Sequence, residues 1–407
     1  MTVTVDTIRA AARIIEGAVV RTPLVHSGPL SDLTGATVYL KLETLQYTGS
    51  FKDRGALVKL TSLTPDQASR GVIAVSAGNH AQGVAYHARR LGIPATIVMP
   101  MTTPFTKINR TEALGARVLL HGDSVTACMP YATGILEKQQ LTFVHPFDDE
   151  HIIAGQGTVG LEILDDLPSL DAILVPIGGG GLISGIATTV AASGRAIEVI
   201  GVEAELYPST LNALRGEDVP TGGATLAEGI AIKSPGALTL PIVRELVADV
   251  VTADELALED AVQTMIISAK VLAEGAGAAP LAALTALRKR FAGKTVVLVV
   301  SGANIDSRIL ASVLMRGMVR SGQMVRLRVT ISDAPGVLAR VAQLIGEHAG
   351  NIVEIVHQRL FFDVPVKQAE VDIVVETQDT DHVADIIRHL ELNGFPTRRL
   401  GDTALTG

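Results

Sequence analysis

Between Thr37 and about Asp306, short apolar runs alternate with helical patterns of apolar and polar residues. Gly, Pro or polar residues bound each apolar run, which predicts buried strands at residues 72–75, 95–99, 117–120, 172–176, 197–202 and 295–300. Helices are predicted between them at residues 81–91, 106–114, 152–164, 182–192 and 279–291. This alternation favours an α/β fold of doubly wound, mostly parallel sheets. Because the run is too long for one sheet, we expect two α/β halves, with a crossing near residues 146–151.

The pattern changes after about residue 322. Residues 325–332 (V-R-L-R-V-T-I-S) alternate apolar and polar positions, and Asp333-Ala334-Pro335-Gly336 is a turn before a helix at 337–348. Further strands are predicted at 351–358 and 369–377, a helix at 379–392 and a last strand near 396–400. Strands with a period of two imply a sheet with one open face. We therefore predict a separate small α+β domain, joined by a linker at 315–323.

Composition limits the partners. The formal net charge is −8, and no block rich in Lys and Arg occurs, so nucleic acid and anionic membranes are not expected partners. One cysteine excludes an internal disulfide framework, and no Cys/His spacing indicates a metal site. The first 13 residues do not resemble a signal peptide, and no stretch of about 18 apolar residues appears. A cytoplasmic location is the expectation.

A first motif, T-G-S-F-K-D-R-G at residues 48–55, joins a glycine-bearing loop to a predicted helix start. Lys52 in this motif is either a solvated lysine or a Schiff-base nucleophile. Burial favours the second role, because it lowers the pKa of an amine and only the neutral amine attacks a carbonyl.

Two more motifs follow predicted strands. Ser76-Ala77-Gly78-Asn79-His80 either caps the next helix through Ser76 or Asn79, or turns backbone N–H groups toward a carboxylate. Ser301-Gly302-Ala303-Asn304 is either a turn and helix cap, or places the Ser301 hydroxyl beside a heterocyclic nitrogen.

The fourth motif is a run of glycines, Gly178, Gly179, Gly180 and Gly181, between a strand and a helix. Its backbone can wrap an anion at the helix N-terminus, where oriented N–H groups gather. The alternative is a flexible turn. Neither a Walker P-loop nor a G-x-G-x-x-G fingerprint is present. Two carboxylates, Glu203 and Glu274, are weaker candidates for the site or for a cation ligand.

In this order, the motifs S-F-K-D-R-G-A, S-A-G-N-H-A-Q-G, G-G-G-G-L and S-G-A-N resemble the threonine/serine dehydratase branch of the pyridoxal-phosphate enzymes with the tryptophan-synthase-β fold. The resemblance runs from about Ile15 to Asp306. It implies fold type II, with a catalytic domain at residues 1–320 and a small subdomain, about 50–150, inserted in the large one.

The resemblance also implies residue roles. The cofactor would be held by Phe51, Lys52 through a Schiff base, Asn79 at the ring 3-oxygen, Gly178, Gly179, Gly180 and Gly181 at the phosphate, and Ser301 at the pyridine nitrogen. The substrate carboxylate would be received by the loop of Ser76, Ala77, Gly78 and His80. Relatives have a cation site near Glu203, which leaves a monovalent or divalent cation open, and a cofactor-adjacent carboxylate at Glu274.

The activity implied is that of a threonine ammonia-lyase. L-threonine would give 2-oxobutanoate and ammonia, and L-serine would give pyruvate, with Lys52 as the base that removes the Cα proton. A role in isoleucine biosynthesis follows as an expectation, and so does a tetramer. The tail, residues 321–407, resembles a ferredoxin-like ACT regulatory domain, which binds an amino-acid or nucleotide effector or only mediates dimerisation.

Three other interpretations stay open. Serine racemase has S-S-G-N-H in this loop and needs the second serine on the ring face opposite the lysine, where this chain has Ala77. Hydroxyaspartate dehydratase needs an additional cationic group, which the sequence does not reveal. A non-catalytic amino-acid sensor would not need Lys52.

Overall fold

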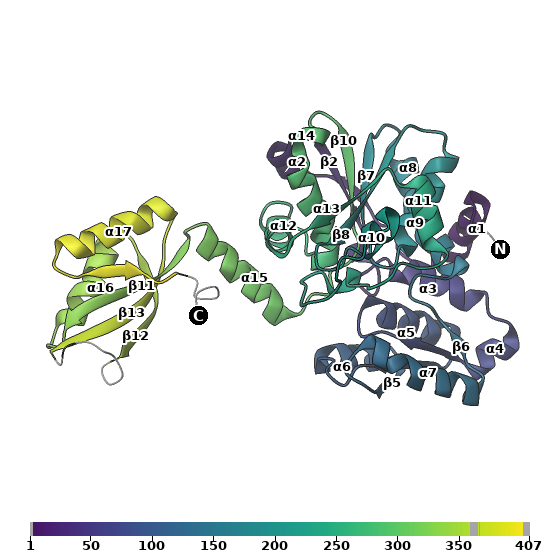
Figure 1. Cartoon of the computed structure of the whole chain (residues 1–407), viewed down its shortest axis with the longest axis horizontal. Coiled ribbons are helices and arrows are strands. Elements are labelled where there is room, and N and C mark those ends of the chain that lie inside the picture. The colour runs from purple at the N-terminus through teal and green to yellow at the C-terminus, as the bar shows by residue number, and fades with distance from the viewer. Residues whose placement is uncertain (1–2, 359–364, 366, 402–407) are drawn as a thin grey trace. The chain divides into compact units, whose positions relative to one another are not determined.

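The computed structural model describes residues 3–358, 365 and 367–401. The chain divides into two compact units, Met1–Ile305 and Asp306–Gly407 (Figure 1). This division comes before the predicted boundary at residue 320, because the helix α15 (Ser307–Arg320) belongs to the second unit. The linker expected at residues 315–323 is therefore mostly helical, which corrects that prediction. Asp306 caps α15 by accepting from the backbone N–H groups of Arg308 and Ile309.

The larger sheet of the first unit has the strand order β1-β2-β10-β7-β8-β9 and is parallel except for β1, which runs antiparallel to β2. Apart from Thr295, every residue of the central strands β10 and β7 is buried, as parallel strands covered on both faces require. The strands are β1 (Leu24–His26), β2 (Thr37–Leu42), β7 (Ala172–Pro176), β8 (Glu198–Ala204), β9 (Asp249–Ala253) and β10 (Thr295–Val300).

Helices cover both faces of this sheet, and Figure 1 shows α9 and α13 on opposite sides of it. The helical elements are α1 (Val5–Ile15), α2 (Gly28–Thr34), η1 (Glu43–Leu45), α3 (Lys52–Thr61), α4 (Pro65–Arg70), α8 (Glu150–Asp166), α9 (Gly181–Ala192), α10 (Ser209–Arg215), η2 (Glu228–Ile230), α11 (Thr239–Leu246), α12 (Glu255–Ile267), α13 (Gly275–Ala286) and α14 (Arg288–Phe291). The single helix expected at 279–291 is thus two helices, and it begins earlier than predicted. None of the described helices is long and apolar enough to cross a membrane.

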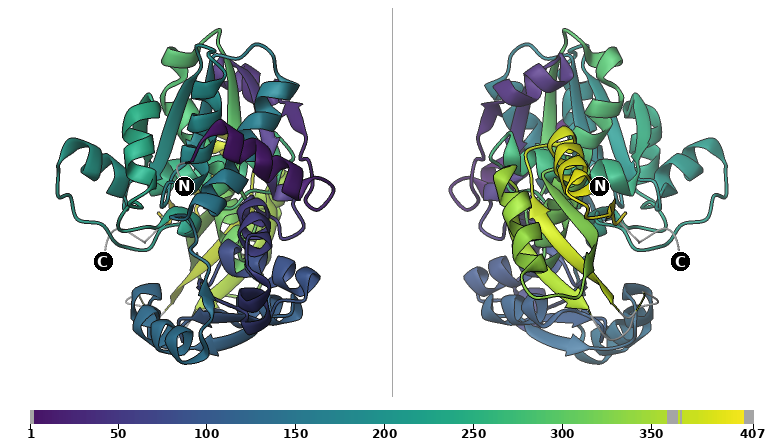
Figure 2. Two further views of the ribbon diagram at one scale, coloured as in Figure 1. Left: turned by 90° about the vertical axis from the view of Figure 1, so that its right-hand side faces the viewer. Right: turned by 90° about the vertical axis from the view of Figure 1, so that its left-hand side faces the viewer.

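A smaller parallel sheet, with the order β5-β4-β3-β6, lies within the same unit. Figure 2 shows this part, in blue, beneath the larger sheet. Its strands are β3 (Val72–Val75), β4 (Ala95–Met99), β5 (Arg117–Leu120) and β6 (Thr142–Phe143), and its helices include α5 (Asn79–Leu91), α6 (Phe105–Ala113) and α7 (Val125–Gln139). The chain returns to the larger sheet between β6 and α8.

Helices α3, α8 and α9 approach one another at glycines. A Cβ added to Gly155 of α8 would lie 2.6 Å from the Cα of Gly55 in α3. One added to Gly185 of α9 would lie 2.5 Å from the backbone nitrogen of Gly157 in α8. Such distances leave no room for a side chain in a close-packed interior. Because α3 begins at Lys52 and α9 at Gly181, α8 holds two helix starts in a fixed relation.

Two cations and two carboxylates are buried together beside α3. Arg54 donates to both oxygens of Glu43 at 2.8 Å and to Glu162 at 2.6 Å. Lys41 donates to Glu162 at 2.5 Å. Burial by itself raises the pKa of Glu43, but the charge and hydrogen bonds of Arg54 bring the pKa of that carboxyl below its ordinary value. The network ties β2, η1, α3 and α8 together.

The second unit has the antiparallel strand order β12-β13-β11-β14. Helices α16 and α17 pack against one face of the sheet through a shared apolar core. After α15 the elements are β11 (Met324–Ser332), α16 (Val337–Glu347), β12 (Asn351–Gln358), β13 (Gln368–Glu376), α17 (Thr380–Leu392) and β14 (Thr397–Arg399). The predicted order of strands and helices is confirmed, including the last short strand.

Candidate active site

The four sequence motifs lie at element ends of the first unit. Lys52 begins α3, and the Ser76–His80 segment joins β3 to α5. The glycine run joins β7 to α9, and Ser301 directly follows β10. These are the places where open α/β sheets bind ligands.

Lys52 is half-buried, and its amine faces the segment that connects the two sheets. Nζ donates to the carbonyl oxygen of Pro146 at 2.6 Å and lies 5.0 Å from the centroid of the Phe51 ring. Burial lowers the pKa of Lys52 to about 8, although the charge of Glu274 acts in the opposite direction. The partial burial of Lys52 and its bond to Pro146 favour the Schiff-base role over that of an ordinary solvated lysine at a helix start.

Backbone pairing brings the Lys52 segment against the Ser301 segment. The N–H of Phe51 donates to the carbonyl of Ser301 at 3.0 Å, and the N–H of Ala303 donates to the carbonyl of Gly49 at 2.9 Å. A β-bridge joins Ser50 to Gly302 between these bonds. Ser301 thus lies beside Lys52, and it does not cap α15, because that helix is capped by Asp306.

Asn79 is held by partners on both sides of its amide. Its Nδ2 donates to Glu274 Oε1 at 2.6 Å, and its Oδ1 accepts from Asn304 Nδ2 at 2.7 Å. Asn304 in turn accepts from Arg110 of α6 at 2.9 Å. Burial raises the pKa of Glu274 to about 7. These bonds fix the orientation of the Asn79 amide and link α6 to the large sheet.

The loop before α5 presents backbone donors. Gly78, not Ser76 or Asn79, is the N-cap residue, and no side chain caps the helix. Helix α5 begins two residues before its predicted start, so the N–H groups of its first turn, from Asn79 onward, have no partner within the helix. Ser76 Oγ accepts from the N–H of Gly78 at 3.2 Å and shapes the turn. Ala77 lies half-buried in the same turn.

The His80 side chain does not belong to this group of backbone donors. Its ring is buried, and Nε2 lies 2.9 Å from the carbonyl oxygen of Val144, to which it donates. Burial and then the nearby charge of Lys52 lower the pKa of His80 to about 3. The ring is therefore neutral, with Nε2 held by Val144, and the backbone N–H of His80 lies in the first turn of α5.

The glycine loop is packed rather than flexible. A Cβ added to Gly179 would lie 2.2 Å from the Phe147 ring, and one on Gly180 would lie 2.8 Å from Thr239 Oγ1. Thr239 Oγ1 also donates to the carbonyl of Gly179 at 2.6 Å. Gly180 has a φ of 92°, which a residue with a side chain rarely adopts. The bare backbone stands at the N-terminus of α9, where free N–H groups favour an anion.

Glu203 has a different setting from the other candidates. It is fully buried and accepts from the backbone N–H groups of Thr210 and Leu211, at 2.8 and 3.0 Å, at the start of α10. Burial raises the pKa of its carboxyl. Among the described residues, no group of three or more His, Cys, Asp or Glu side chains suits a metal ion. A cation at Glu203 stays a prediction.

The sequence did not reveal the segment from His145 to Asp148 as part of the site. His145 Nδ1 accepts from the N–H of Asp148 at 2.7 Å, and Asp148 accepts from Ala237 and Leu238 at 3.0 and 2.8 Å. This places the Pro146 carbonyl at Lys52 and the Phe147 ring at Gly179. The one signal in the sequence that pointed to this segment was the predicted crossing near residues 146–151. A segment that crosses between the two sheets can contact residues of both.

Comparison with known proteins decides the family. Residues 15–302 match the family described as pyridoxal-phosphate dependent enzyme, and residues 320–392 match the ACT domain. The chain belongs to the pyridoxal-phosphate dependent enzymes. It carries an ACT domain at its C-terminal end.

Relatives of this enzyme include two proteins named L-threonine ammonia-lyase. One, from Thermotoga maritima, is 43% identical over 98% of this chain and 100% of its own length. The other, from Geobacter sulfurreducens, is 45% identical over 92% of this chain and 94% of its own. Among solved structures, a threonine deaminase from T.th. is 40% identical with a TM-score of 0.70 over 74% of this chain and 99% of its own. Serine racemase from Dictyostelium discoideum is 33% identical with a TM-score of 0.70 over 75% and 100%.

The residues present fit the cofactor of this pyridoxal-phosphate enzyme. Ser301 is only 2% exposed, and among the described residues its hydroxyl makes no hydrogen bond, so it suits a ring nitrogen. The loop from Gly178 to Gly181 leaves backbone N–H groups for a phosphate at the start of α9. Lys52 supplies a buried amine with a lowered pKa.

Proposed function

We propose that this chain is an L-threonine ammonia-lyase that also accepts L-serine. The observation that carries the proposal is the Lys52 amine, which is buried, donates to the Pro146 carbonyl oxygen and is lowered in pKa to about 8. Such an amine can exchange its proton near neutral pH and can link to a carbonyl. The two relatives named L-threonine ammonia-lyase support the choice of reaction.

We assign cofactor and substrate binding to this chain's own residues. Lys52 would link to the cofactor aldehyde, Phe51 and Asn79 would flank its ring, and Ser301 would meet its nitrogen. Gly178 to Gly181 would hold its phosphate. The substrate carboxylate would lie at the start of α5, on N–H groups of the loop from Ser76 to His80.

The bound cofactor supplies an electron sink for the charge left when the Cα proton is removed. Lys52 takes that proton, and its lowered pKa matches the task near neutral pH. The amide of Asn79, fixed by Glu274 and Asn304, orients the ring. Ser301 is an uncharged partner for the ring nitrogen, so it does not hold a positive charge there as a carboxylate would. This favours prompt loss of the β-hydroxyl over transamination.

Serine racemase is the alternative that the structural neighbours raise. Racemisation requires a second acid/base on the ring face opposite Lys52. Ala77 occupies the loop position at which the racemase motif has serine, and a methyl group carries no proton. The dehydratase is therefore preferred.

We propose in addition that the ACT domain binds an amino-acid effector, with isoleucine or valine as the first candidates. The match of residues 320–392 to this domain supports the proposal. Assays with and without each amino acid test it, and unchanged kinetics in every case would count against it.

The decisive experiment measures 2-oxo acids from purified holoenzyme with L-threonine, L-serine, D-serine and threo-3-hydroxyaspartate. We expect 2-oxobutanoate from L-threonine and pyruvate from L-serine, and loss of both products and of the yellow cofactor absorbance in Lys52→Ala. No oxo acid from either L-amino acid, from protein that holds the cofactor, would overturn the proposal. Interconversion of L- and D-serine would indicate the racemase, and a preference for hydroxyaspartate would indicate that dehydratase.

A further inference from the structure

The chain crosses from the smaller sheet to the larger one through residues 144–149, between β6 and α8, which we call the crossing segment. It contacts the first turns of two other helices. The carbonyl oxygen of Val144 accepts from His80 Nε2 of α5 at 2.9 Å. The carbonyl oxygen of Pro146 accepts from Lys52 Nζ of α3 at 2.6 Å. The crossing segment therefore joins the start of α5 to the proposed Schiff-base lysine.

The next residues of the crossing segment pack against the glycine loop. A Cβ added to Gly179 would lie 2.2 Å from the Phe147 ring, and one added to Gly181 would lie 3.0 Å from the Phe147 carbonyl oxygen. The Asp148 carboxylate accepts from two backbone N–H groups just before α11. Because Phe147 directly follows Pro146, a change of the backbone here would alter the contacts with Lys52 and with the glycine loop together.

The His145 side chain shapes this part of the backbone. Its Nδ1 accepts from the N–H of Phe147 at 3.3 Å and from the N–H of Asp148 at 2.7 Å. These two bonds close a turn around Pro146, which has no N–H group of its own. They therefore set the direction of the carbonyl group that meets Lys52.

The partners of His145 decide which form of its ring the turn can use. A backbone N–H group only donates, so Nδ1 must offer a lone pair to Phe147 and Asp148, and the hydrogen of the neutral ring is on Nε2. Protonation would put a hydrogen on Nδ1 as well. That hydrogen would face two N–H groups, and both bonds would be lost. The turn at Pro146 needs a neutral His145 ring.

The surroundings of His145 favour the neutral ring. Burial lowers the pKa of His145 below its ordinary value of 6.5, while Asp148 acts to raise this pKa, Lys52 of α3 to lower it and Asp149 to raise it. His80 of α5 also interacts with His145, and its own ring is neutral. Because the pKa of His145 is lowered, the ring gains a proton only in acid, below about pH 6.5.

We propose that His145 is a positioning residue for the Lys52 amine, and that it acts only as a neutral ring. It works through the Pro146 carbonyl, which holds Nζ in one place, and through Phe147, which packs on the glycine loop. The inference rests on the proposed role of Lys52 as the residue that links to the cofactor. It adds that the backbone facing this amine depends on the protonation state of one histidine.

Uptake of pyridoxal phosphate by the apo-enzyme, followed by absorbance, tests the proposal, because it needs the Lys52 amine but no substrate. The test variants are His145→Ala, which removes the acceptor, and His145→Asn. The asparagine oxygen accepts from backbone N–H groups two or three residues later and does not titrate. Each rate is compared with wild type at the same pH, so that the titration of Lys52 itself cancels.

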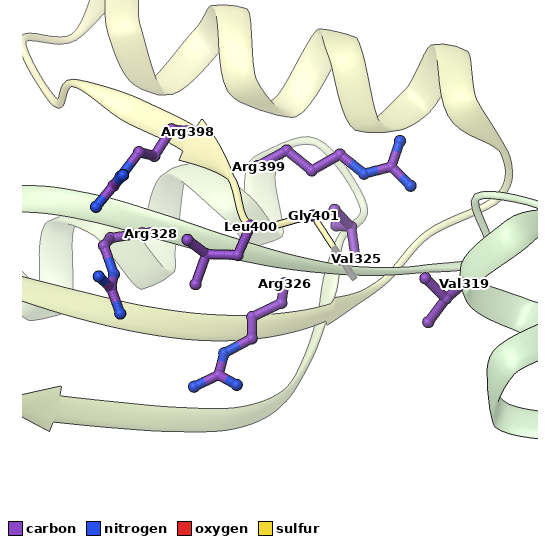
Figure 3. Close-up of a pocket in the computed structure, with 8 residues that line it drawn as sticks. All are labelled: Val319, Val325, Arg326, Arg328, Arg398, Arg399, Leu400 and Gly401. Carbon is purple, nitrogen blue, oxygen red and sulfur yellow. The ribbon is translucent and has the colours of Figure 1, made fainter. Parts of the chain in front are cut away.

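The matched control is His382→Ala. His382 Nδ1 also accepts from a backbone N–H group, that of Gln378 at 3.0 Å. His382 belongs to α17 of the second unit, the pale yellow helix above β14 in Figure 3. The control thus removes the same kind of hydrogen bond from the unit that does not contain Lys52.

At about pH 7.5, where His145 is neutral, we expect His145→Asn and His382→Ala to take up the cofactor at the wild-type rate. His145→Ala should be at least about tenfold slower, because the turn loses two hydrogen bonds. As pH falls from about 7 to about 5, the rate of His145→Asn relative to wild type should rise at least about twofold, since only the wild-type ring gains a proton.

A wild-type rate in His145→Ala, or a rate in His145→Asn as low as in His145→Ala, would overturn the proposal. So would an equal loss in His382→Ala, or a ratio of His145→Asn to wild type that does not change with pH. This ratio decides alone if His145→Ala does not fold. Protein that shows the expected uptake but forms no oxo acid would overturn the proposed function and leave the role of His145 standing.

Discussion

The amide of Asn304 donates to the amide oxygen of Asn79 at 2.7 Å, and through it the end of β10 reaches the start of α5. Asn304 Nδ2 also donates to the carbonyl of Thr48 at 2.7 Å, so one side chain joins three of the four motif segments. Asn304 is therefore a positioning residue for Asn79.

Asn304→Ala should weaken cofactor binding about fivefold to tenfold, because the Asn79 amide loses a hydrogen bond worth about 1 kcal/mol. Titration of the apo-enzyme with pyridoxal phosphate, followed by absorbance, measures the effect. Arg110→Ala is the control, since this exposed residue reaches Asn79 only through Asn304 and its loss should matter less. Unchanged affinity in Asn304→Ala would show that Asn79 needs no such support.

The Lys52 pKa of about 8 predicts how cofactor uptake depends on pH. Only the neutral amine reacts, so the rate of uptake by apo-enzyme should rise about tenfold per pH unit below 8 and then level off. Rates of absorbance change between pH 6 and 9, with Lys52→Ala as the blank, check this. A rate that keeps rising to pH 10 would indicate an ordinary solvated lysine.

Asp53 should make the fold less stable as pH rises. Burial raises the pKa of this carboxyl to about 6, although the hydrogen bonds donated by Thr48 act to lower it. The folded state thus binds the proton more tightly than the unfolded state, so the stability is full below about pH 4 and is lost as pH rises through 6.

Asp53→Asn removes this titration and should therefore stabilise the protein by about 1 kcal/mol more at pH 8 than at pH 5. Urea unfolding at both pH values measures the difference, with circular dichroism as the probe because the chain has no Trp. A difference between variant and wild type that is the same at both pH values would contradict the prediction.

Arg54→Met should be strongly destabilising, by about 3–5 kcal/mol, because Glu43 and Glu162 would lose a buried cation. The control is Arg9→Met, whose side chain is 57% exposed and pairs with exposed Asp6, a contact worth at most about 1 kcal/mol. Thermal melts of both variants, with cofactor present, test this. Equal melting temperatures would mean that the network contributes little to stability.

The sequence predicted elements well where burial is complete. The bounds of β3, β4, β7 and β10 agree with the predicted ones, because each is an apolar run on a covered strand. Those of the edge strand β5 agree as well, although none of its residues is buried. Strand β9 was missed, since it lies at the sheet edge and its sequence D-V-V-T-A is half polar. The start of α5 was placed late because Gly78, which carries no side chain, occupies the N-cap position.

The site was predictable only as separate motifs. Each motif follows a strand or begins a helix, and this much is visible in one sequence. The partners are not, because Lys52 meets Pro146 across 94 residues and Asn79 meets Asn304 across 225. The sequence also did not show which of the two glutamates would contact Asn79. In the structure Glu274 accepts from Asn79, whereas Glu203 accepts from a backbone N–H at the start of α10.

The glycine contacts between α3, α8 and α9 set the distance between two parts of the proposed active site. Lys52 lies at the start of α3, and the glycine loop lies at the start of α9. Both helices contact α8 backbone against backbone, at Gly55–Gly155 and at Gly157–Gly185. A single methyl group at any of these contacts would change the distance between the Lys52 amine and the glycine loop. The spacing of the proposed site therefore depends on buried glycines to which no role in binding cofactor or substrate is assigned.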